Sequence, residues 1–326
     1  MEHKDDTNPM DKQSGHMPGE GAPDTGTVQE TTGTAPGIRT GQETARHSRR
    51  MMRGEVRPGS AWALVTGAGS GIGRCYALRL AALGYRLVIV GNNAAPLEAV
   101  AGEIRRAAGA NASASFPEVR VMPMDLARVG AAQELHDRTA AEGIEIDVVI
   151  NNAGIFSFCD ILTTPAERIE RIILLHDLTV SQLCRLYAAD MVRRGVRGHI
   201  LNMSSYSLWM PFPGLALYSA SKAYLRSFSV AFAKEVREHG IRVTAVCPAG
   251  VATDLYGLTP RWQRIGTRLG VLITADSCAR RGLRALWRGR RCIVPDWWNR
   301  VWIPLCKMLP MWVLRPVRRF TMKFQK

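Results

Sequence analysis

The feature that most limits how this chain can fold is a glycine-rich turn between a short apolar run and an amphipathic stretch. The apolar run Trp62–Thr66 leads into Gly67-Ala68-Gly69-Ser70-Gly71-Ile72-Gly73, and helical periodicity continues to Leu83. Glycine permits a positive φ and a close approach of the backbone, and the N–H groups at the start of a helix favour a pyrophosphate. A strand, such a turn and a helix in this order predict a dinucleotide-binding unit.

Beyond this turn, short apolar runs alternate with longer amphipathic stretches. The alternation predicts an α/β fold over residues 58–295, a single Rossmann-like doubly wound parallel sheet with helices on both faces. We expect seven strands, at 62–66, 86–90, 120–122, 147–151, 199–203, 242–247 and 291–294. We expect helices at 72–83, 96–108, 131–142, 165–194 with a break inside it, and 219–239.

The two ends of the chain differ in composition from this domain. Residues 1–57 are rich in Gly, Thr, Pro, Asp and Glu without periodicity, which predicts a disordered tail. Residues 296–326 mix tryptophan with basic residues and lack the apolar run of about 18 to 20 residues that spans a bilayer. We expect this basic aromatic extension to make peripheral contact with a membrane; alternatively, its aromatic residues cap the substrate pocket or fill a subunit contact.

Charge and cysteine usage restrict the partners and the compartment. The net charge of the chain is +15. Residues 277–326 contain thirteen Lys or Arg and one acid, so this segment carries +12 of that charge. In the rest of the chain positive and negative charges nearly balance, and it has no zinc-finger spacing, basic heptads or aromatic RNA-binding signature. This argues against nucleic acid as a binding partner. The seven cysteines form no Cys-x-x-Cys pair, and residues 1–57 contain no signal-peptide core. We therefore expect a cytoplasmic protein without a bound metal, held at the inner membrane surface if the C-terminal extension binds lipid.

Five further motifs follow the glycine-rich turn in a fixed order. They are Asp125-Leu126, Asn151-Asn152-Ala153-Gly154, Ser204-Ser205, Tyr218-x-x-x-Lys222 and Cys247-Pro248-Ala249-Gly250-Val251-Ala252-Thr253. Together with the turn, this set resembles the short-chain dehydrogenase/reductase family, and within it the bacterial lipid- and ketoacyl-type reductases. The resemblance covers residues 61–295 and implies an NAD(P)-dependent oxidoreductase that acts on CH–OH groups and forms homo-oligomers.

The resemblance also implies which residues hold the dinucleotide. Asp125 would meet the adenine edge, residues 151–154 would shape the floor of the site, and Val251 and Thr253 would contact the nicotinamide amide. The full set of expected cofactor contacts is Thr66, Gly67, Ser70, Gly71, Ile72, Gly73, Asn92, Asp125, Leu126, Asn151, Ala153, Gly154, Tyr218, Lys222, Pro248, Val251 and Thr253.

Tyr218 and Lys222 are the expected acid–base pair. They lie four residues apart on a predicted helix, so both side chains share one face. A phenol with a pKa of about 10 is a poor acid–base catalyst near neutrality, but an adjacent ammonium favours its ionised form. Tyr218 would exchange a proton with the substrate oxygen as hydride is transferred. By resemblance, Lys222 would also hold the nicotinamide ribose, and Ser205, thirteen residues before Tyr218, would hydrogen-bond the substrate oxygen.

One position departs from the family pattern. Many members carry an asparagine fifteen residues before the methionine that closes the helix, and counting back from Met191 reaches His176. In the family this asparagine helps to bend the helix and to hold a water in a proton relay to the lysine. Two alternatives stay open: the His176 imidazole replaces it as a catalytic residue in the relay, or His176 is a spacer and the relay is weakened.

The residues after the second strand bear on cofactor choice. Gly91-Asn92-Asn93 offers neither an acid that would repel a 2′-phosphate nor an arginine that would bind it, and NADP(H) is favoured over NAD(H). Arg74 would add a positive field there.

The segment before Tyr218 bears on the substrate. Trp209, Met210, Phe212 and Leu215 predict an apolar pocket, and hence a carbonyl or secondary alcohol on an apolar or lipid-like molecule. The alternatives are an NAD-dependent steroid or sugar-alcohol dehydrogenase and a non-catalytic, membrane-associated redox sensor that binds the dinucleotide.

Overall fold

A seven-stranded parallel sheet forms the centre of the protein. The computed structural model describes residues 59–109, 118–209, 213–253, 259–268 and 272–296. The strand order is β3-β2-β1-β4-β5-β6-β9, so the direction of winding reverses between β1 and β4. The doubly wound Rossmann-like sheet with seven strands is thus confirmed. The bounds are β1 Trp62–Thr66, β2 Arg86–Gly91, β3 Val119–Pro123, β4 Ile146–Asn151, β5 His199–Met203, β6 Arg242–Val246 and β9 Cys292–Ile293.

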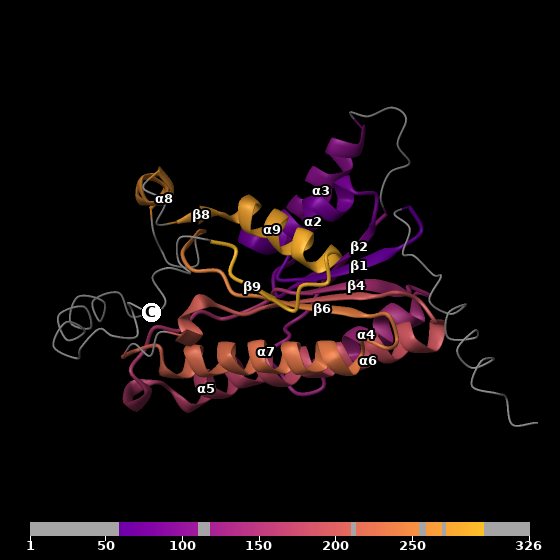
Figure 1. Cartoon of the computed structure of the whole chain (residues 1–326). Coiled ribbons are helices and arrows are strands. Elements are labelled where there is room, and N and C mark those ends of the chain that lie inside the picture. The colour runs from indigo at the N-terminus through magenta and orange to yellow at the C-terminus, as the bar shows by residue number, and fades with distance from the viewer. Residues whose placement is uncertain (1–58, 110–117, 210–212, 254–258, 269–271, 297–326) are drawn as a thin grey trace, which may run out of the picture. The chain divides into compact units, whose positions relative to one another are not determined.

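Helices cover both faces of this sheet (Figure 1). One face carries α2 (Gly71–Ala82), α3 (Ala94–Gly109) and α9 (Ala275–Trp287). The other face carries α4 (Ala131–Ala141), α5 (Ala166–Ile173), α6 (Val180–Arg194) and α7 (Ala216–Glu235). The central strands are therefore buried on both sides, which is why they are continuous apolar runs rather than alternating ones.

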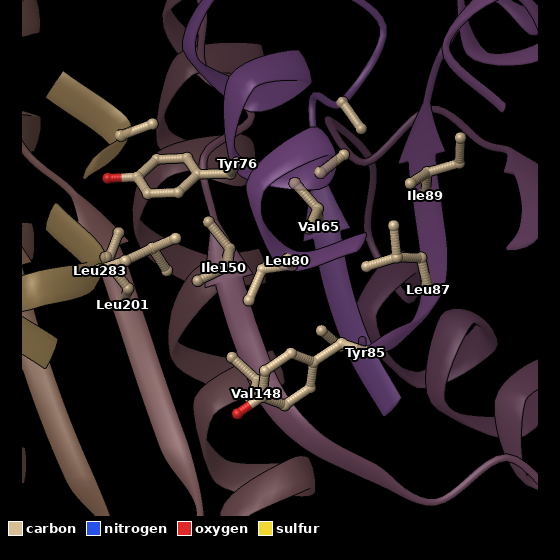
Figure 2. Packing of buried hydrophobic residues seen from close by; sticks show 14 of the residues in the cluster. Val65, Tyr76, Leu80, Tyr85, Leu87, Ile89, Val148, Ile150, Leu201 and Leu283 are labelled. Atoms are coloured by element: carbon tan, nitrogen blue, oxygen red, sulfur yellow. The ribbon is translucent and has the colours of Figure 1, made fainter. Parts of the chain in front are cut away.

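The core under α2 and α9 shows how tightly these layers fit. Val65 and Ile150 of the sheet pack beneath Leu80 of α2, and the Tyr76 ring reaches across toward α9 (Figure 2). A Cβ at Gly282 of α9 would lie 2.2 Å from the Tyr76 hydroxyl oxygen, so glycine makes room for this ring. This close packing holds α2, and with it the glycine-rich turn, against the sheet.

The predicted break in the long helix is a π-helical turn. This turn, Leu174–Thr179, separates α5 from α6. Other elements were not predicted from the sequence: α8 (Pro260–Arg268), α9, the two-stranded sheet of β7 (Val251–Ala252) and β8 (Ile273–Thr274), and 3₁₀ turns at Ile161–Thr163 and Tyr206–Trp209. A local signal for α9 exists, because the Thr274 side chain accepts a hydrogen bond from the Ser277 N–H as an N-cap.

The predicted N-terminal tail and nearly all of the C-terminal extension lie outside the described residues, so both remain predictions. Within the described ranges, none of the helices has the length and apolar character needed to cross a membrane.

Candidate active site

A cavity of about 540 Å³ lies where the parallel strands end. The segments that follow β1 to β6 all contribute to its wall, because the carboxyl ends of parallel strands meet at one edge of the sheet. Motifs far apart in the sequence therefore surround one space. The predicted site residues that line it are Gly67, Ser70, Gly71, Ile72, Asn92, Asp125, Leu126, Ala153, Gly154, Ser205, Tyr218, Lys222, Pro248, Val251 and Thr253.

The other predicted site residues, Thr66, Gly73, Asn151 and His176, lie behind this lining. The Thr66 hydroxyl oxygen accepts hydrogen bonds from the N–H groups of Asn152 and Ala153, each at 3.0 Å. Asn151 is buried and donates to the Asn202 side-chain oxygen at 2.8 Å. Thr66 and Asn151 thus tie the ends of β1, β4 and β5 together rather than facing the cavity.

The glycine-rich turn has no room for larger residues. Gly67 and Gly71 have φ values of 65° and 54°, in the left-handed region that glycine tolerates. A Cβ at Gly73 would lie 2.0 Å from the Gly67 carbonyl oxygen and 2.5 Å from the side-chain amide nitrogen of Asn152. That amide donates to the carbonyl oxygens of Thr66 and Gly67, at 3.1 and 3.2 Å. The backbone at the start of α2 is thereby exposed to the cavity, as the pyrophosphate of a dinucleotide requires.

Tyr218 and Lys222 lie on one face of α7, and both are buried at the cavity wall. The Lys222 ammonium nitrogen is 5.6 Å from the centroid of the Tyr218 ring and donates to the Met203 carbonyl oxygen at 3.0 Å. The Phe156 ring packs edge-on against Tyr218, with centroids 5.1 Å apart. These contacts hold the phenol and the ammonium side by side.

Burial strongly affects the Lys222 ammonium. Loss of solvent lowers the pKa of Lys222 from 10.5 to about 8, and the nearby Asp177 carboxylate opposes the shift. Burial in turn raises the pKa of Asp177 to about 6, against the effect of Lys222. At neutral pH the ammonium is still mostly present, at a cost to folding stability.

Replacing Lys222 by methionine should remove this cost. Between about pH 8 and pH 10.5 the unfolded chain keeps the Lys222 proton and the folded chain releases it, so wild-type stability rises with pH in this window. The stability advantage of Lys222→Met should therefore be largest below pH 8 and shrink above it. Urea unfolding at pH 7.5 and 10 measures this, with Lys234→Met, at an exposed site on the same helix, as the control. A difference that does not change with pH would contradict the expectation.

Ser205 is better placed than Ser204 to meet a substrate. The Ser204 hydroxyl donates to the Lys222 carbonyl oxygen at 2.6 Å and so anchors α7 to β5. The Ser205 hydroxyl oxygen accepts from the Ser207 N–H at 3.2 Å, which leaves its proton available for a ligand in the cavity.

His176 lies in the π-helical turn and is completely buried. Its Nε2 accepts a hydrogen bond from the Ile155 N–H at 3.0 Å, so the proton is on Nδ1, which donates to the Ser221 hydroxyl at 2.8 Å. Ser221 donates onward to the Tyr218 carbonyl oxygen at 2.9 Å. Burial, with a smaller contribution from Lys222, holds the pKa of His176 well below 6.5, so the ring is neutral. His176 thus connects the floor of the cavity to α7.

The structure corrects the expected role of Arg74. Its Nε donates to a Glu103 carboxylate oxygen at 3.0 Å, and a second nitrogen also binds that carboxylate. The charge of Arg74 is therefore neutralised rather than directed at the cofactor site.

Arg171 was not predicted as a site residue, yet it lines the cavity and binds the Asp125 carboxylate at 3.0 Å. Burial alone would raise the pKa of Asp125, but the Ala127 N–H and the Arg171 guanidinium outweigh it and lower the pKa. No sequence motif points to Arg171, because it is one of several charged residues on an amphipathic helix. Asp125 is thus held as a carboxylate at the wall of the cavity.

The predicted apolar substrate segment is only partly described. Met210 and Phe212 lie outside the described residues, and neither Trp209 nor Leu215 lines the cavity. The Trp209 ring instead packs against Tyr206 and beneath the Arg226 guanidinium, which lies 5.5 Å from its centroid. Near Tyr218, apolar lining comes from Ile155 and Phe156, which the sequence motifs did not indicate.

Comparisons with known proteins show which proteins the chain is similar to. The family model described as short chain dehydrogenase matches residues 61–264. The chain is 35% identical over 217 residues to the probable oxidoreductase EphD of Mycobacterium tuberculosis, covering 65% of this chain and 35% of that protein. It is 36% identical over 210 residues to a very-long-chain 3-oxoacyl-CoA reductase of Anas platyrhynchos, covering 62% of this chain and 64% of that protein. The chain thus spans between about a third and two thirds of these curated relatives.

Solved structures share the overall fold. A short-chain dehydrogenase from Sphingobium yanoikuyae in complex with NADPH superimposes with a TM-score of 0.63 at 29% identity, covering 74% of this chain and 92% of that one. A structure from work on the stereoselectivity of 7beta-hydroxysteroid dehydrogenase superimposes with a TM-score of 0.66 at 25% identity. The match covers 78% of this chain and 94% of that one.

Proposed function

Because this chain belongs to the short-chain dehydrogenase family, we propose that it is an NAD(P)-dependent oxidoreductase that interconverts a carbonyl group and a secondary alcohol. The observation that carries the proposal is the placement of Tyr218 and Lys222. Both are buried side by side on α7, and both face the cavity that the glycine-rich turn and Ser205 also line. A phenol next to an ammonium in a dinucleotide-type cleft is suited to proton transfer to or from an alcohol oxygen.

Each residue then has a defined task. The turn at 67–73 would hold the pyrophosphate. Asp125 would contact the adenine end of the dinucleotide, and Thr253 would contact the nicotinamide end. A bound nicotinamide supplies or accepts the hydride. Tyr218 gives its phenolic proton to the carbonyl oxygen, or takes one from the alcohol. Ser205 donates a hydrogen bond to the same oxygen, and the Lys222 ammonium stabilises the tyrosinate.

The hydrogen bonds of His176 support a positioning role. Both ring nitrogens are engaged. One accepts from the Ile155 N–H at the lining of the cavity, and the other donates to the Ser221 hydroxyl on α7. The ring also packs edge-on against Tyr218, with centroids 6.0 Å apart. His176 then acts through Tyr218 and the floor rather than by carrying the reaction's proton.

Replacing His176 by leucine should leave the Ile155 N–H buried without an acceptor. We expect the free energy of unfolding to fall by about 1–3 kcal/mol and kcat to fall about ten- to a hundredfold as Tyr218 shifts. His176→Asn, which restores an acceptor and a donor, should recover much of kcat. Steady-state kinetics and urea unfolding of both variants test this, and an asparagine variant no better than leucine would refute the positioning role.

For the cofactor, we favour NADP(H). No acid stands at Asn92 or Asn93 to repel a 2′-phosphate, and both residues line the cavity. The Sphingobium yanoikuyae relative was solved with NADPH. Arg74 no longer supports this preference, because Glu103 neutralises it.

For the substrate, we favour an apolar or lipid-like carbonyl compound. Ile155 and Phe156 supply an apolar wall beside Tyr218, and a curated relative acts on very-long-chain 3-oxoacyl-CoA. A steroid dehydrogenase is the second candidate, supported by the hydroxysteroid dehydrogenase structure.

Fluorescence titration with NADPH and NADH, followed by turnover of ketones, 3-oxoacyl thioesters and oxosteroids, tests the function. We expect tighter binding of NADPH and turnover of a 3-oxoacyl substrate. Turnover of steroids alone would favour the second candidate. Binding without any turnover would favour the redox sensor, and failure to bind either dinucleotide would refute the proposal.

The surface of α6 and α7 supports assembly into homo-oligomers. Tyr224, Phe228 and Phe232 stack along α7 with ring centroids 6.0 and 5.4 Å apart, and Tyr224 is 43% exposed. Phe228 and Phe232 are partly buried against the core, so Tyr224 is the exposed end of the row, and an exposed aromatic ring of this kind is suited to a subunit contact. Membrane contact through the C-terminal extension remains a proposal, because that segment lies outside the described residues.

A further inference from the structure

A second hollow lies far from the active site, between α2 and α9. It is a groove of about 400 Å³, here called the α2–α9 groove. Its floor is apolar and its rim is basic. The floor residues are Ala82, Leu83, Leu283 and Trp287, and the rim residues are Arg79, Arg280, Arg284 and Arg288.

Three of the rim arginines carry charge that the described residues do not balance. Arg280, Arg284 and Arg288 follow one another at four-residue spacing and are all exposed. In the described part of the chain, no carboxylate lies within 4.0 Å of them, whereas Arg79 is paired with Asp276 at 2.6 Å. Like charges at this spacing destabilise a helix, so a binding partner of opposite charge would relieve the repulsion.

The floor of the groove is rigid and partly open to solvent. The Trp287 ring stacks on Tyr85 with centroids 6.0 Å apart and meets His199 edge-on at 4.5 Å. Leu83, which directly follows α2 as its C-cap, is 48% exposed. A fixed tryptophan and an exposed leucine among arginines form a surface that suits a partner with both anionic and apolar parts.

The position of the groove bears on what can bind there. Tyr85 precedes β2 and His199 begins β5, so this part of the groove lies at the end of the sheet where the strands start. The active-site cavity lies where the strands finish. A partner in the α2–α9 groove would therefore leave the cavity open.

We propose that the α2–α9 groove binds the surface of an anionic lipid bilayer. The guanidinium groups of Arg280, Arg284 and Arg288 would bind headgroup phosphates, while the exposed Leu83 side chain would enter the boundary with the acyl chains and Trp287 would support it from the floor. A second copy of the chain is a poor partner, because a symmetric contact here would bring the arginines together. Nucleic acid would use the charges but would leave the leucine and tryptophan unexplained.

Co-sedimentation of the full chain with vesicles tests this proposal. We expect binding to phosphatidylglycerol–phosphatidylcholine vesicles and little binding to phosphatidylcholine alone. The triple variant Arg280→Gln/Arg284→Gln/Arg288→Gln should bind anionic vesicles about tenfold or more weakly. The matched control is Arg106→Gln/Arg138→Gln/Arg237→Gln, which removes the same charge from exposed positions elsewhere and should bind nearly as wild type. Leu83→Gln should weaken binding by a smaller factor, about two- to fivefold.

An equal loss in both triple variants would overturn the proposal, because net charge or another segment would then account for the binding. Equal binding to neutral vesicles would also overturn it. A groove variant that lost affinity for a short DNA duplex but not for vesicles would assign the surface to nucleic acid instead. Dinucleotide titration of each variant verifies folding, since none of these residues lines the active-site cavity.

Discussion

Tyr218→Phe is expected to lower kcat by a factor of about 10²–10⁴ without weakening dinucleotide binding. The substitution removes only the phenolic oxygen and keeps the ring that packs against Phe156 and His176. The fold and the position of Lys222 should therefore be preserved, and the loss should appear in the chemical step. Single-turnover reduction of the best substrate, with NADPH titration alongside, measures the two effects separately.

Tyr224→Phe is the matched control for this experiment. It removes a hydroxyl from a tyrosine on the same helix, but Tyr224 is exposed and hydrogen-bonded to Ser181 away from the cavity. It should turn over like the wild type. Unchanged activity of Tyr218→Phe would remove Tyr218 as the general acid and base, even if dinucleotide binding is found.

Gly73→Ala should greatly weaken dinucleotide binding. The new methyl group would lie 2.0 Å from the Gly67 carbonyl oxygen and 2.7 Å from the Gly67 carbonyl carbon, and both are backbone atoms that cannot rotate away. The turn must therefore open, so that its N–H groups leave the pyrophosphate position. We expect the Kd for NADPH to rise at least about tenfold and the free energy of unfolding to fall by about 1–3 kcal/mol. Fluorescence titration and urea unfolding test both effects.

Gly102→Ala provides the control for the Gly73 substitution. Gly102 also lies in a helix, but the nearest atom to its added Cβ is the end of the flexible Arg106 side chain at 3.6 Å. Alanine there should leave binding unchanged and raise stability by up to about 1 kcal/mol. If Gly73→Ala bound NADPH as tightly as Gly102→Ala, the turn would not be the pyrophosphate site.

The sequence was sufficient for most of the fold because the signals involved are local. The strand β1 is apolar at nearly every position, and all of its residues are buried. A strand buried on both faces must be largely apolar, and such runs were recognisable for the central strands β1, β2 and β4, whereas the edge strand β3 alternates buried and exposed residues. The site motifs follow the ends of these strands, so their meeting at one edge follows from parallel topology.

The sequence was insufficient where a residue's role depends on a distant partner. The sequence predicted that Arg74 would add a positive field at the cofactor site, yet Glu103, 29 residues away, neutralises the Arg74 charge. His176 could have been a relay or a spacer, and only the folded chain shows the contacts with Ile155 and Ser221 that define its tautomer and the burial that keeps it neutral. The α2–α9 groove joins segments nearly 200 residues apart, as the 197-residue separation of Arg79 and Asp276 shows.

The chain by itself therefore determined its family, its sheet and the residue types at the site, since these depend on apolar runs, glycine conformation and helical spacing. Only the tertiary structure decided which charges are free, which are paired and which are shielded from water. Charge pairing and desolvation depend on the distance between segments that the sequence keeps apart, and for that reason they became visible only in the folded chain.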